Sequence, residues 1–307
     1  MCYLWYNLAI YEGSVFMTTD KYFDKIGLPE GAVETLKRVY GEVKDTEWFC
    51  GYRKKIEEMG SFWEIEADVN ERHERGEINK HELFLTIICS SLDIMQKRMA
   101  DKGLPENVFW DSCNDLVCKA NECIGLRGVW GLDLFAIWYQ LFFEAKRFAL
   151  GRLQYEEWPF NQDEYTFDGI TIKRDDIIVR LHIPSSGKLL IEDVKESFAL
   201  AYKTFPKRDG KVFFMCTSWM LFPNFIEIFD KNSNLYKFAE LFDPAGVMYH
   251  DQFKDAWRIF GTNDTSDTSK LPANSSLQKA FIKYIEETHI YGLGTGVVVC
   301  DETGIIN

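Results

Sequence analysis

Two kinds of hydrophobic pattern divide the chain near Gly151. Before this residue, apolar side chains recur at three- and four-residue steps, as Ala32, Leu36 and Val39 do after Pro29. That spacing places them on one face of a helix, and proline is favoured in a first helical turn. Comparable runs predict helices over residues 48–60, 62–75, 81–100, 106–124 and 132–150. We therefore expect an all-helical N-terminal domain over residues 17–150.

After Gly151, short runs of alternating apolar and polar residues predict strands. They cover residues 152–156, 165–172, 177–183, 212–221, 225–229, 247–251 and 296–300. Helical spacing appears between them at residues 191–205, 235–242 and 276–288. Strands joined partly by short turns and partly by helices form a mixed sheet with helices on its faces. The expected fold class is α+β (mixed), with this second domain over residues 151–307. Residues 1–16 are a candidate disordered extension, because Met17 is a plausible alternative start.

Residues 175–205 contain a strand, a turn and a helix in direct succession. Apolar residues alternate from Ile177 to 183, and Pro184 ends the strand because it cannot donate to a ladder. The turn that follows contains Ser185, Ser186, Gly187 and Lys188. Such a turn can direct free backbone N–H groups and a helix N-terminus at a phosphate. An ordinary strand-to-helix loop is the alternative interpretation.

Polar residues on two of the predicted strands point to a common face. Gln154 and Glu156 alternate with apolar residues on one strand, and Arg180 and His182 do so on the other. If both strands lie in one sheet, these four side chains could line a single cleft. A carboxylate and an imidazole together could accept a proton from an amine. The alternative is a solvated sheet face on which Glu156 pairs with Arg180, an arrangement of little energetic value.

Residues 212–221 (VFFMCTSWML) are too apolar for an edge strand, so we expect a central one. Ser218 would lie in its interior or at a cleft, and is a further candidate catalytic residue. Cys216 is interpreted as a buried, inert thiol, because no third group is present to orient a pair with His182.

Two further patterns resemble binding motifs without matching them. Asp230, Asn232 and Asn234 imitate the start of a calcium loop, but its glycine and final glutamate are missing. We expect no metal site. The glycines at positions 292, 294 and 296 precede a predicted strand, whereas a dinucleotide fingerprint precedes a helix. We interpret them as a hairpin turn, or as a place where another backbone passes close by.

Composition excludes several classes of protein. The 307 residues carry a net charge of −13, which argues against nucleic-acid binding because that requires a basic face. The eight cysteines, without a secretory context, are typical of reduced thiols in the cytoplasm. The apolar N-terminus lacks the basic region of a signal peptide, and no run reaches the roughly 18 apolar residues of a membrane span. We expect a cytoplasmic protein with no membrane partner.

Four segments carry a resemblance to a known family. They are KRFALGRLQYE (146–156), RLHIPSSGKL (180–189), CTSWMLFP (216–223) and the stretch from LPANSSLQKAF to YGLGTGVVV (271–299). Together they resemble bacterial acyltransferase-domain proteins, in which a helical N-terminal domain precedes a GNAT-like C-terminal domain. The most specific piece is the His-Ile-Pro-x-x-Gly-x-Leu block. Two positions depart from the family. Its Arg/Gln-x-x-Gly-x-Gly/Ala loop is replaced by residues 185–188, and Thr217 stands where the family often has histidine.

The resemblance implies transfer of an acyl group from acetyl-CoA, or another acyl-CoA, to an amine of a small molecule or peptide. Residues 185–188 would then hold the CoA pyrophosphate, and we expect the substrate-binding cleft between the sheet and the helical domain. Glu156 or His182 would deprotonate the amine, a hypothesis that rests on strand parity and not on a family motif. The alternative is a non-catalytic protein that binds CoA or a small ligand. A helical partner-docking module would instead need a large exposed aromatic patch on residues 30–150.

Overall fold

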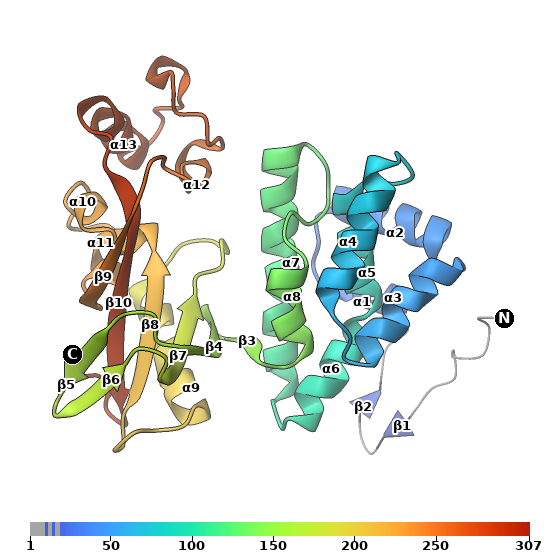
Figure 1. Ribbon diagram of the computed structural model, residues 1–307, viewed down its shortest axis with the longest axis horizontal. Coiled ribbons are helices and arrows are strands. Elements are labelled where there is room, and N and C mark those ends of the chain that lie inside the picture. The colour runs from blue at the N-terminus through green and yellow to red at the C-terminus, as the bar shows by residue number, and fades with distance from the viewer. Residues whose placement is uncertain (1–9, 12–13, 16–18) are drawn as a thin grey trace. The chain divides into compact units, whose positions relative to one another are not determined.

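The computed structural model describes residues 10–11, 14–15 and 19–307 (Figure 1). Two compact units divide the chain, Met1–Ala149 and Leu150–Asn307. At the start, β1 (Ile10–Tyr11) pairs antiparallel with β2 (Ser14–Val15). Most of the candidate extension over residues 1–16, and the alternative start at Met17, lie outside the described residues.

The first unit is built from helices. They are α1 (Thr19–Lys25), α2 (Glu30–Val43), α3 (Glu47–Glu57), α4 (Phe62–Glu74), α5 (Lys80–Ser90), α6 (Leu92–Asp101), α7 (Glu106–Arg127) and α8 (Ala136–Phe143). Their apolar stripes meet around Phe135, whose ring lies 4.6 Å from Phe84 and 5.4 Å from Phe62, measured between centroids. Asn79 caps α5 by accepting hydrogen bonds from two backbone N–H groups, and Gly128 ends α7 at a φ of 72°.

Two predictions for this unit need correction. The single helix predicted over residues 81–100 is two helices, α5 and α6, separated at Ser91. At Ser91 the backbone leaves the helical conformation, with a φ of −114° and a ψ of 8°. The helix predicted over residues 132–150 is limited to α8, because Ala145 adopts a φ of 51° and the chain continues as strand β3 (Arg147–Leu150). The unit is therefore helical for the most part, and not throughout.

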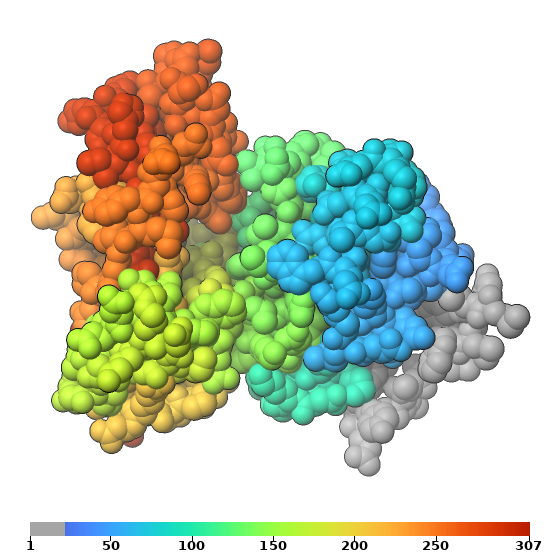
Figure 2. All heavy atoms as spheres, viewed as in Figure 1, coloured from blue at the N-terminus to red at the C-terminus, as the bar shows by residue number. Residues whose placement is uncertain are grey.

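The second unit is a mixed sheet with the strand order β11-β10-β8-β7-β4-β3, with β9 paired to β10. Its strands are β4 (Leu153–Pro159), β7 (Ile177–His182), β8 (Val212–Ser218), β9 (Asp243–His250), β10 (Tyr291–Asp301) and β11 (Gly304–Ile305); β5 (Glu164–Phe167) and β6 (Ile170–Lys173) form a separate hairpin. Its helices are α9 (Ile191–Thr204), η1 (Trp219–Leu221), α10 (Pro223–Ile226), α11 (Asn234–Ala239), α12 (Trp257–Phe260), η2 (Thr268–Lys270) and α13 (Ser276–Glu287). Within this unit, the orange and red atoms of residues 251–290 gather at one end (Figure 2).

The two faces of this sheet are covered by different elements. On one face, Phe198 of α9 packs against Phe214 of β8, with ring centroids 5.1 Å apart, and Ser197 hydrogen-bonds Tyr155 of β4. On the other face, the β5–β6 hairpin adds Ile172 to an apolar cluster. The remaining members of that cluster are Phe160, Ile178, Phe213, Met215, Val297 and Val299. We call the first the α9 face and the second the hairpin face.

Two predictions for the second unit are settled by the structure. The strand predicted over residues 225–229 is wrong: Pro223 begins α10 there, in the helical first-turn position that suits proline. The three alternating glycines lie inside β10 and not in a hairpin turn. A Cβ on Gly294 would lie 1.8 Å from the carbonyl oxygen of Leu221. The alternative explanation, a close approach of another backbone, is therefore the correct one.

Candidate active site

Strand β7 is paired unequally on its two sides. Toward β4 it forms six antiparallel register pairs, from Gln154↔His182 to Pro159↔Ile177. Toward β8, register pairs join only Val179 to Phe214 and Arg180 to Met215, in a parallel arrangement. After Arg180 and Met215 the two strands have no further register pairs in the described part of the chain. We call the space between these unpaired ends the β7–β8 opening.

Strands β7 and β8 both continue past their last shared register pair. In a parallel pair, each strand offers N–H and C=O groups to its neighbour. Residues 181–182 and 216–218 have no register partner across the opening, and each of these segments is paired in register on its other side, with β4 and with β10. The parallel ladder is therefore shorter than either strand.

A row of polar side chains crosses the hairpin face at this opening. Gln154 is paired in register with His182, and Thr217 is paired with Thr295. The next row toward the apolar cluster is Glu156, Arg180, Met215 and Val297. Each residue in this row is the register partner of the next one. Because side chains alternate along a strand, His182 and Thr217 lie on the same face, on opposite sides of the opening.

Glu156 is the centre of a buried polar cluster on this face. Its side chain is 1% exposed, and its Oε1 accepts hydrogen bonds from Arg180 Nε at 2.6 Å and from His182 Nε2 at 2.8 Å. The Arg180 guanidinium also stacks on Trp158, 3.7 Å from the ring centroid. The sharing of one face by Gln154, Glu156, Arg180 and His182, predicted from parity, is confirmed. The alternative of a solvated pair is wrong in one respect, since Glu156 is paired with Arg180 but buried.

This arrangement fixes the chemistry of the imidazole. An ionised carboxylate can only accept hydrogen bonds, so His182 Nε2 carries the proton that Glu156 accepts. The lone pair of the neutral ring is then on Nδ1. A carboxylate that orients an imidazole in this way is a recurring arrangement for general bases. Arg180 balances the charge of Glu156, which stabilises the carboxylate in its ionised form.

Ser218 is not brought together with Glu156 and His182. It is one residue beyond Thr217 along β8, so its side chain lies on the α9 face. Its hydroxyl accepts a hydrogen bond from Met220 N and caps η1. Cys216 lies on the same face as Ser218, and burial raises the pKa of its thiol to about 12. A thiol that remains protonated is no nucleophile, in agreement with the interpretation of Cys216 as inert.

The candidate phosphate turn lies between β7 and α9. Ser185, Gly187 and Lys188 are exposed, Ser186 is half-buried, and Gly187 has a φ of 65°. Leu190, at the N-cap of α9, makes no side-chain capping hydrogen bond to the first turn of the helix. The first turn of α9 carries Glu192 and Asp193, whose charges oppose an anion. The turn therefore fits a phosphate by its backbone better than by its charge.

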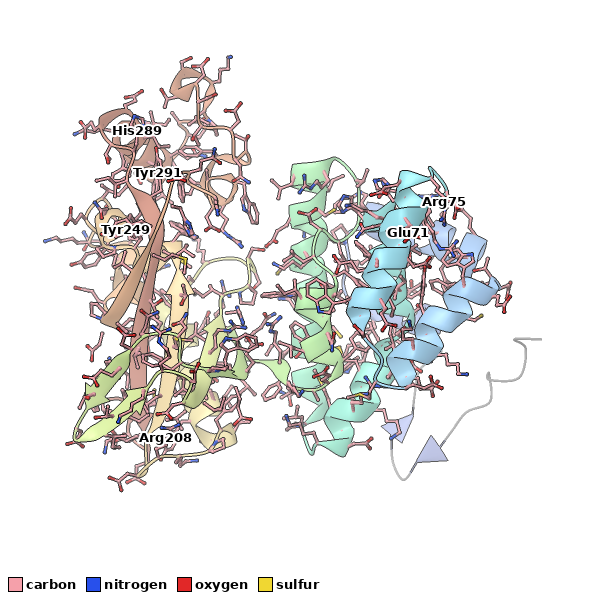
Figure 3. All side chains as sticks on the ribbon, viewed as in Figure 1. Glu71, Arg75, Arg208, Tyr249, His289 and Tyr291 are labelled. Atoms are coloured by element: carbon pink, nitrogen blue, oxygen red, sulfur yellow. The ribbon has the colours of Figure 1, made fainter. Side chains whose placement is uncertain are left out.

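A small cavity in the second unit lies away from these groups. It has a volume of about 60 Å³ and is lined by Ile177, Val212, Arg208 and Lys211, among others. These residues stand where β7 and β8 begin, at the end of the strands opposite the β7–β8 opening. In Figure 3, Arg208 is labelled in the lower part of the second unit, and Tyr249 and Tyr291 are labelled well above it. Arg208 forms an ion pair with Asp176, and Lys211 forms one with Asp168. The basic side chains that line this cavity are therefore already paired with carboxylates.

Sequence reasoning missed Thr295 and Trp158. Thr295 stands between two of the flagged glycines, and the glycine pattern was the only local signal there.

Over residues 30–149, all of which are described, Trp63 is the one aromatic among the large exposed hydrophobic side chains. The exposed aromatic patch required for a helical docking module is thus missing. In the described chain, no three His, Cys, Asp or Glu residues are grouped to hold a metal ion. None of its described helices is both long and apolar enough to span a membrane.

Comparison with known proteins places the chain in a family. The model of an N-acyltransferase N-terminal domain matches residues 17–145, and that of a GNAT-like C-terminal domain matches residues 148–298. The chain belongs to the acyltransferase-domain family in which these two domains follow one another. No curated protein matches it significantly in sequence.

Solved structures share the fold. An acyltransferase in complex with decanoyl-CoA and teicoplanin is 18% identical, with a TM-score of 0.67 over 92% of this chain and 87% of that one. A mutant acyltransferase in complex with octanoyl-CoA is 17% identical, with a TM-score of 0.67 over 95% and 88%. A third, in complex with CoA and 10C-teicoplanin, is also 17% identical with a TM-score of 0.67, over 95% and 90%. At such identities the likeness shows the fold alone.

Proposed function

We propose that this protein is an acyl-CoA-dependent N-acyltransferase that transfers the acyl group of acetyl-CoA, or a longer acyl-CoA, to an amine of a small molecule or peptide. The observation that carries the proposal is the Glu156–His182 pair beside the β7–β8 opening. The family supports the reaction class, and the acyl-CoA complexes of the structural relatives support the donor.

In this proposal the opening receives the donor. The pantetheine arm of CoA contains two amides, which can pair with the backbone groups that β7 and β8 leave outside the ladder. The thioester then lies against β7, where a backbone N–H can donate to its carbonyl oxygen as negative charge develops. The turn at Ser185, Ser186, Gly187 and Lys188 and the N-terminus of α9 hold the pyrophosphate. Glu192 and Asp193 weaken that contact, so we expect modest affinity.

His182 acts as the general base. Its Nδ1 takes a proton from the attacking amine, while Glu156 keeps the ring in the required tautomer and stabilises the imidazolium that forms. The amine nitrogen bonds to the carbonyl carbon, and the carbon–sulfur bond breaks. Histidine is frequent at position 217 in the family that this chain resembles; here the imidazole is supplied from β7, in the polar row on the other side of the opening. We assign no catalytic role to Ser218.

The acceptor is proposed as an amine-bearing small molecule or peptide. Two structural relatives were solved with teicoplanin or a teicoplanin derivative, which supports a search among glycopeptide-like amines first. The acyl chain is proposed from the structural relatives as well, since two of them are complexes with decanoyl-CoA and with octanoyl-CoA.

A ligand titration tests the donor site first. The melting temperature of the purified protein is measured with CoA, acetyl-CoA, octanoyl-CoA and decanoyl-CoA. A ligand at a hundred times its dissociation constant should stabilise the folded state by about 2.7 kcal/mol. Lys188→Glu should remove most of the shift, whereas Lys231→Glu, a matched charge reversal on an exposed turn elsewhere, should not.

Release of CoA thiol in the presence of an amine library then tests transfer. No shift with any of the four ligands would refute the proposal at its first step. Binding without transfer to any amine would favour the alternative, a non-catalytic CoA-binding protein.

A further inference from the structure

Two threonine hydroxyls face each other at the β7–β8 opening. Thr217 of β8 and Thr295 of β10 are paired in register, and their Oγ1 atoms are 2.8 Å apart. Thr295 is 5% exposed and Thr217 is half-buried. Thr217 stands in the same polar row as His182, on the opposite wall of the opening. The proposed mechanism gives these hydroxyls no role.

The pair contains one more donor than it uses. Each hydroxyl has one proton and can also accept. The two share a single hydrogen bond, in which one hydroxyl donates its proton to the other. The accepting hydroxyl still has its own proton to donate. In the described structure neither hydroxyl makes another side-chain hydrogen bond. When Thr295 donates to Thr217, the half-buried Thr217 keeps a proton that it can donate to a molecule in the opening.

The position of the pair indicates what that partner is. In the proposed reaction, the amine approaches the carbonyl carbon from the side of His182. A thioester held between the two strands has β7 with His182 on one side and β8 with Thr217 on the other, and in this inference its sulfur lies on the β8 side. There the electron pair of the breaking carbon–sulfur bond becomes a full negative charge on sulfur. A hydroxyl that donates to this charge lowers the barrier, because the hydrogen bond is stronger to the thiolate than to the thioester.

We propose that Thr217 donates a hydrogen bond to the departing CoA thiolate, while Thr295 donates to Thr217 and orients it. The inference rests on the proposed function. Both hydroxyls remain protonated throughout. The proton that His182 takes from the amine passes to solvent, and the thiolate takes a proton from solvent to leave as CoA thiol. The net transfer is one proton from the amine to sulfur, with no oxidant or reductant.

A structural role is the competing explanation. Cross-strand threonine pairs stabilise sheets, and Thr166 and Thr171 form such a pair on the exposed β5–β6 hairpin, with their Oγ1 atoms 2.9 Å apart. The decisive readout must therefore depend on the thiolate. We choose the pKa of the thiol of bound CoA, which requires no acceptor amine and no turnover.

The thiol is titrated in the complex by the ultraviolet absorbance of the thiolate. The same titration with S-methyl-CoA, which has no ionisable thiol, is subtracted to remove the protein's own cysteines. A hydrogen bond to the charged form lowers a pKa, so the bound thiol should titrate at least about one unit below free CoA. Thr217→Val should return most of that shift, Thr217→Ser should keep it, and Thr295→Val should lose part of it. Thr171→Val, the matched control, should change nothing.

Turnover gives a second measurement once an acceptor is known. Loss of one hydrogen bond to a charged group should lower kcat by roughly 10- to 100-fold in Thr217→Val, with KM for the acyl-CoA little changed.

The outcomes separate the two proposals. If wild-type protein does not bind CoA, the proposed function and this inference fail together. If CoA binds with the same thiol pKa in wild type and Thr217→Val, the inference fails and the proposed function stands. An equal change in Thr171→Val would show a general effect of the sheet and would also overturn the inference. If Thr217→Val does not fold, Thr295→Val and Thr217→Ser carry the same comparison.

Discussion

The two sides of strand β7 teach how a sheet can hold a binding site. On the β4 side the strand is fixed along its length by six antiparallel register pairs. On the β8 side two pairs hold it, and the strands then part. The six pairs with β4 and the packing of α9 on β8 hold the strands in place, so the ladder between β7 and β8 can be short without loss of the sheet.

The hairpin face shows the same contrast along the strands. At one end it is an apolar cluster that the β5–β6 hairpin covers. At the other it carries Gln154, Glu156, Arg180, His182 and the threonine pair. The change from apolar to polar side chains coincides with the end of the β7–β8 ladder. The polar side chains are hydrogen-bonded to one another at Glu156–Arg180, Glu156–His182 and Thr217–Thr295, which lets them lie where the apolar cluster ends.

We expect the largest effect on stability from a substitution at the close contact between β10 and η1, which follows directly after β8. Gly294→Ala places a Cβ 1.8 Å from the Leu221 carbonyl oxygen, which belongs to η1 at the end of β8. Because backbone cannot move aside as a flexible side chain does, we expect the free energy of unfolding to fall by about 3 kcal/mol or more. Denaturant unfolding measures it. Gly51→Ala, on an exposed helical position with no atom within 4 Å of the added Cβ, should instead be neutral or stabilising. Equal losses would mean that the close approach at Gly294 is not what matters.

The next effect concerns the base. His182→Gln keeps a polar group of similar size beside Glu156 but removes the titratable imidazole. If the proposed mechanism holds, kcat should fall by roughly 10²–10⁴-fold, and the limb of the pH profile that reports the base should disappear. Steady-state kinetics over pH measures both. His289→Gln, an exposed histidine far along the unit, serves as the control (Figure 3). An unchanged pH profile in His182→Gln would exclude this residue as the base.

Removing the charge of Glu156 should have a smaller effect on stability. Glu156→Gln leaves Arg180 without its carboxylate, but the guanidinium is 23% exposed and still stacks on Trp158. We expect a loss of about 1–2 kcal/mol in unfolding free energy, below the usual cost of breaking a fully buried pair. Glu157→Gln, one position along β4 and exposed, should change stability by less than about 0.5 kcal/mol. Equal effects at the two positions would argue that the burial of Glu156 has no energetic consequence.

The smallest predicted effect concerns Cys216, which lies on the α9 face of β8, whereas Thr217 lies on the hairpin face. The pKa of the Cys216 thiol is raised to about 12 by burial, whereas a thiol in the unfolded chain titrates near about 8.5. The folded state therefore keeps this proton longer as pH rises. Below about pH 8 the thiol should not affect the pH dependence of stability, and from about pH 8.5 upward it should lower the unfolding free energy.

Cys216→Ala should reduce that decline by at most about 1.4 kcal/mol per pH unit. Denaturant unfolding from pH 7 to 9.5 checks the slope. Met215→Ala, which removes buried volume from the same strand but no thiol, should leave the slope as it is. A slope that does not differ between wild type and Cys216→Ala would contradict the assigned burial effect.

Local periodicity predicted what depends on neighbours in sequence. The alternation at Glu156 and His182 predicted one shared face on the condition that both strands lie in one sheet, because side-chain direction in a strand repeats every two residues. The pairing of β4 with β7 meets that condition. Most helices of the first unit followed from apolar spacing for the same reason. The strand predicted over residues 225–229 was wrong because the aromatic run resembles a strand, while Pro223 and the packing of Phe225 favour a helical turn.

What depends on register could not be predicted. Thr217 meets Thr295 across 78 positions of sequence, and no local pattern fixes which residues of two such strands become partners. The same limitation affected Ser218, whose polarity was visible but whose face depends on where β8 lies in the sheet. The β7–β8 opening is likewise a property of two strands together.

The register of the polar row also has a consequence for how the molecule acquires its structure. Its members come from β4, β7, β8 and β10, and the parallel pair needs α9 as a crossover. Pairings between distant segments form late, because the chain loses the entropy of closing long loops before the contacts between those segments stabilise it. Helical contacts such as those of α5 and α7 are local and form earlier. Amide protection in β10 during refolding should therefore follow protection in those helices, and the proposed site should be among the last parts of the protein to come into existence.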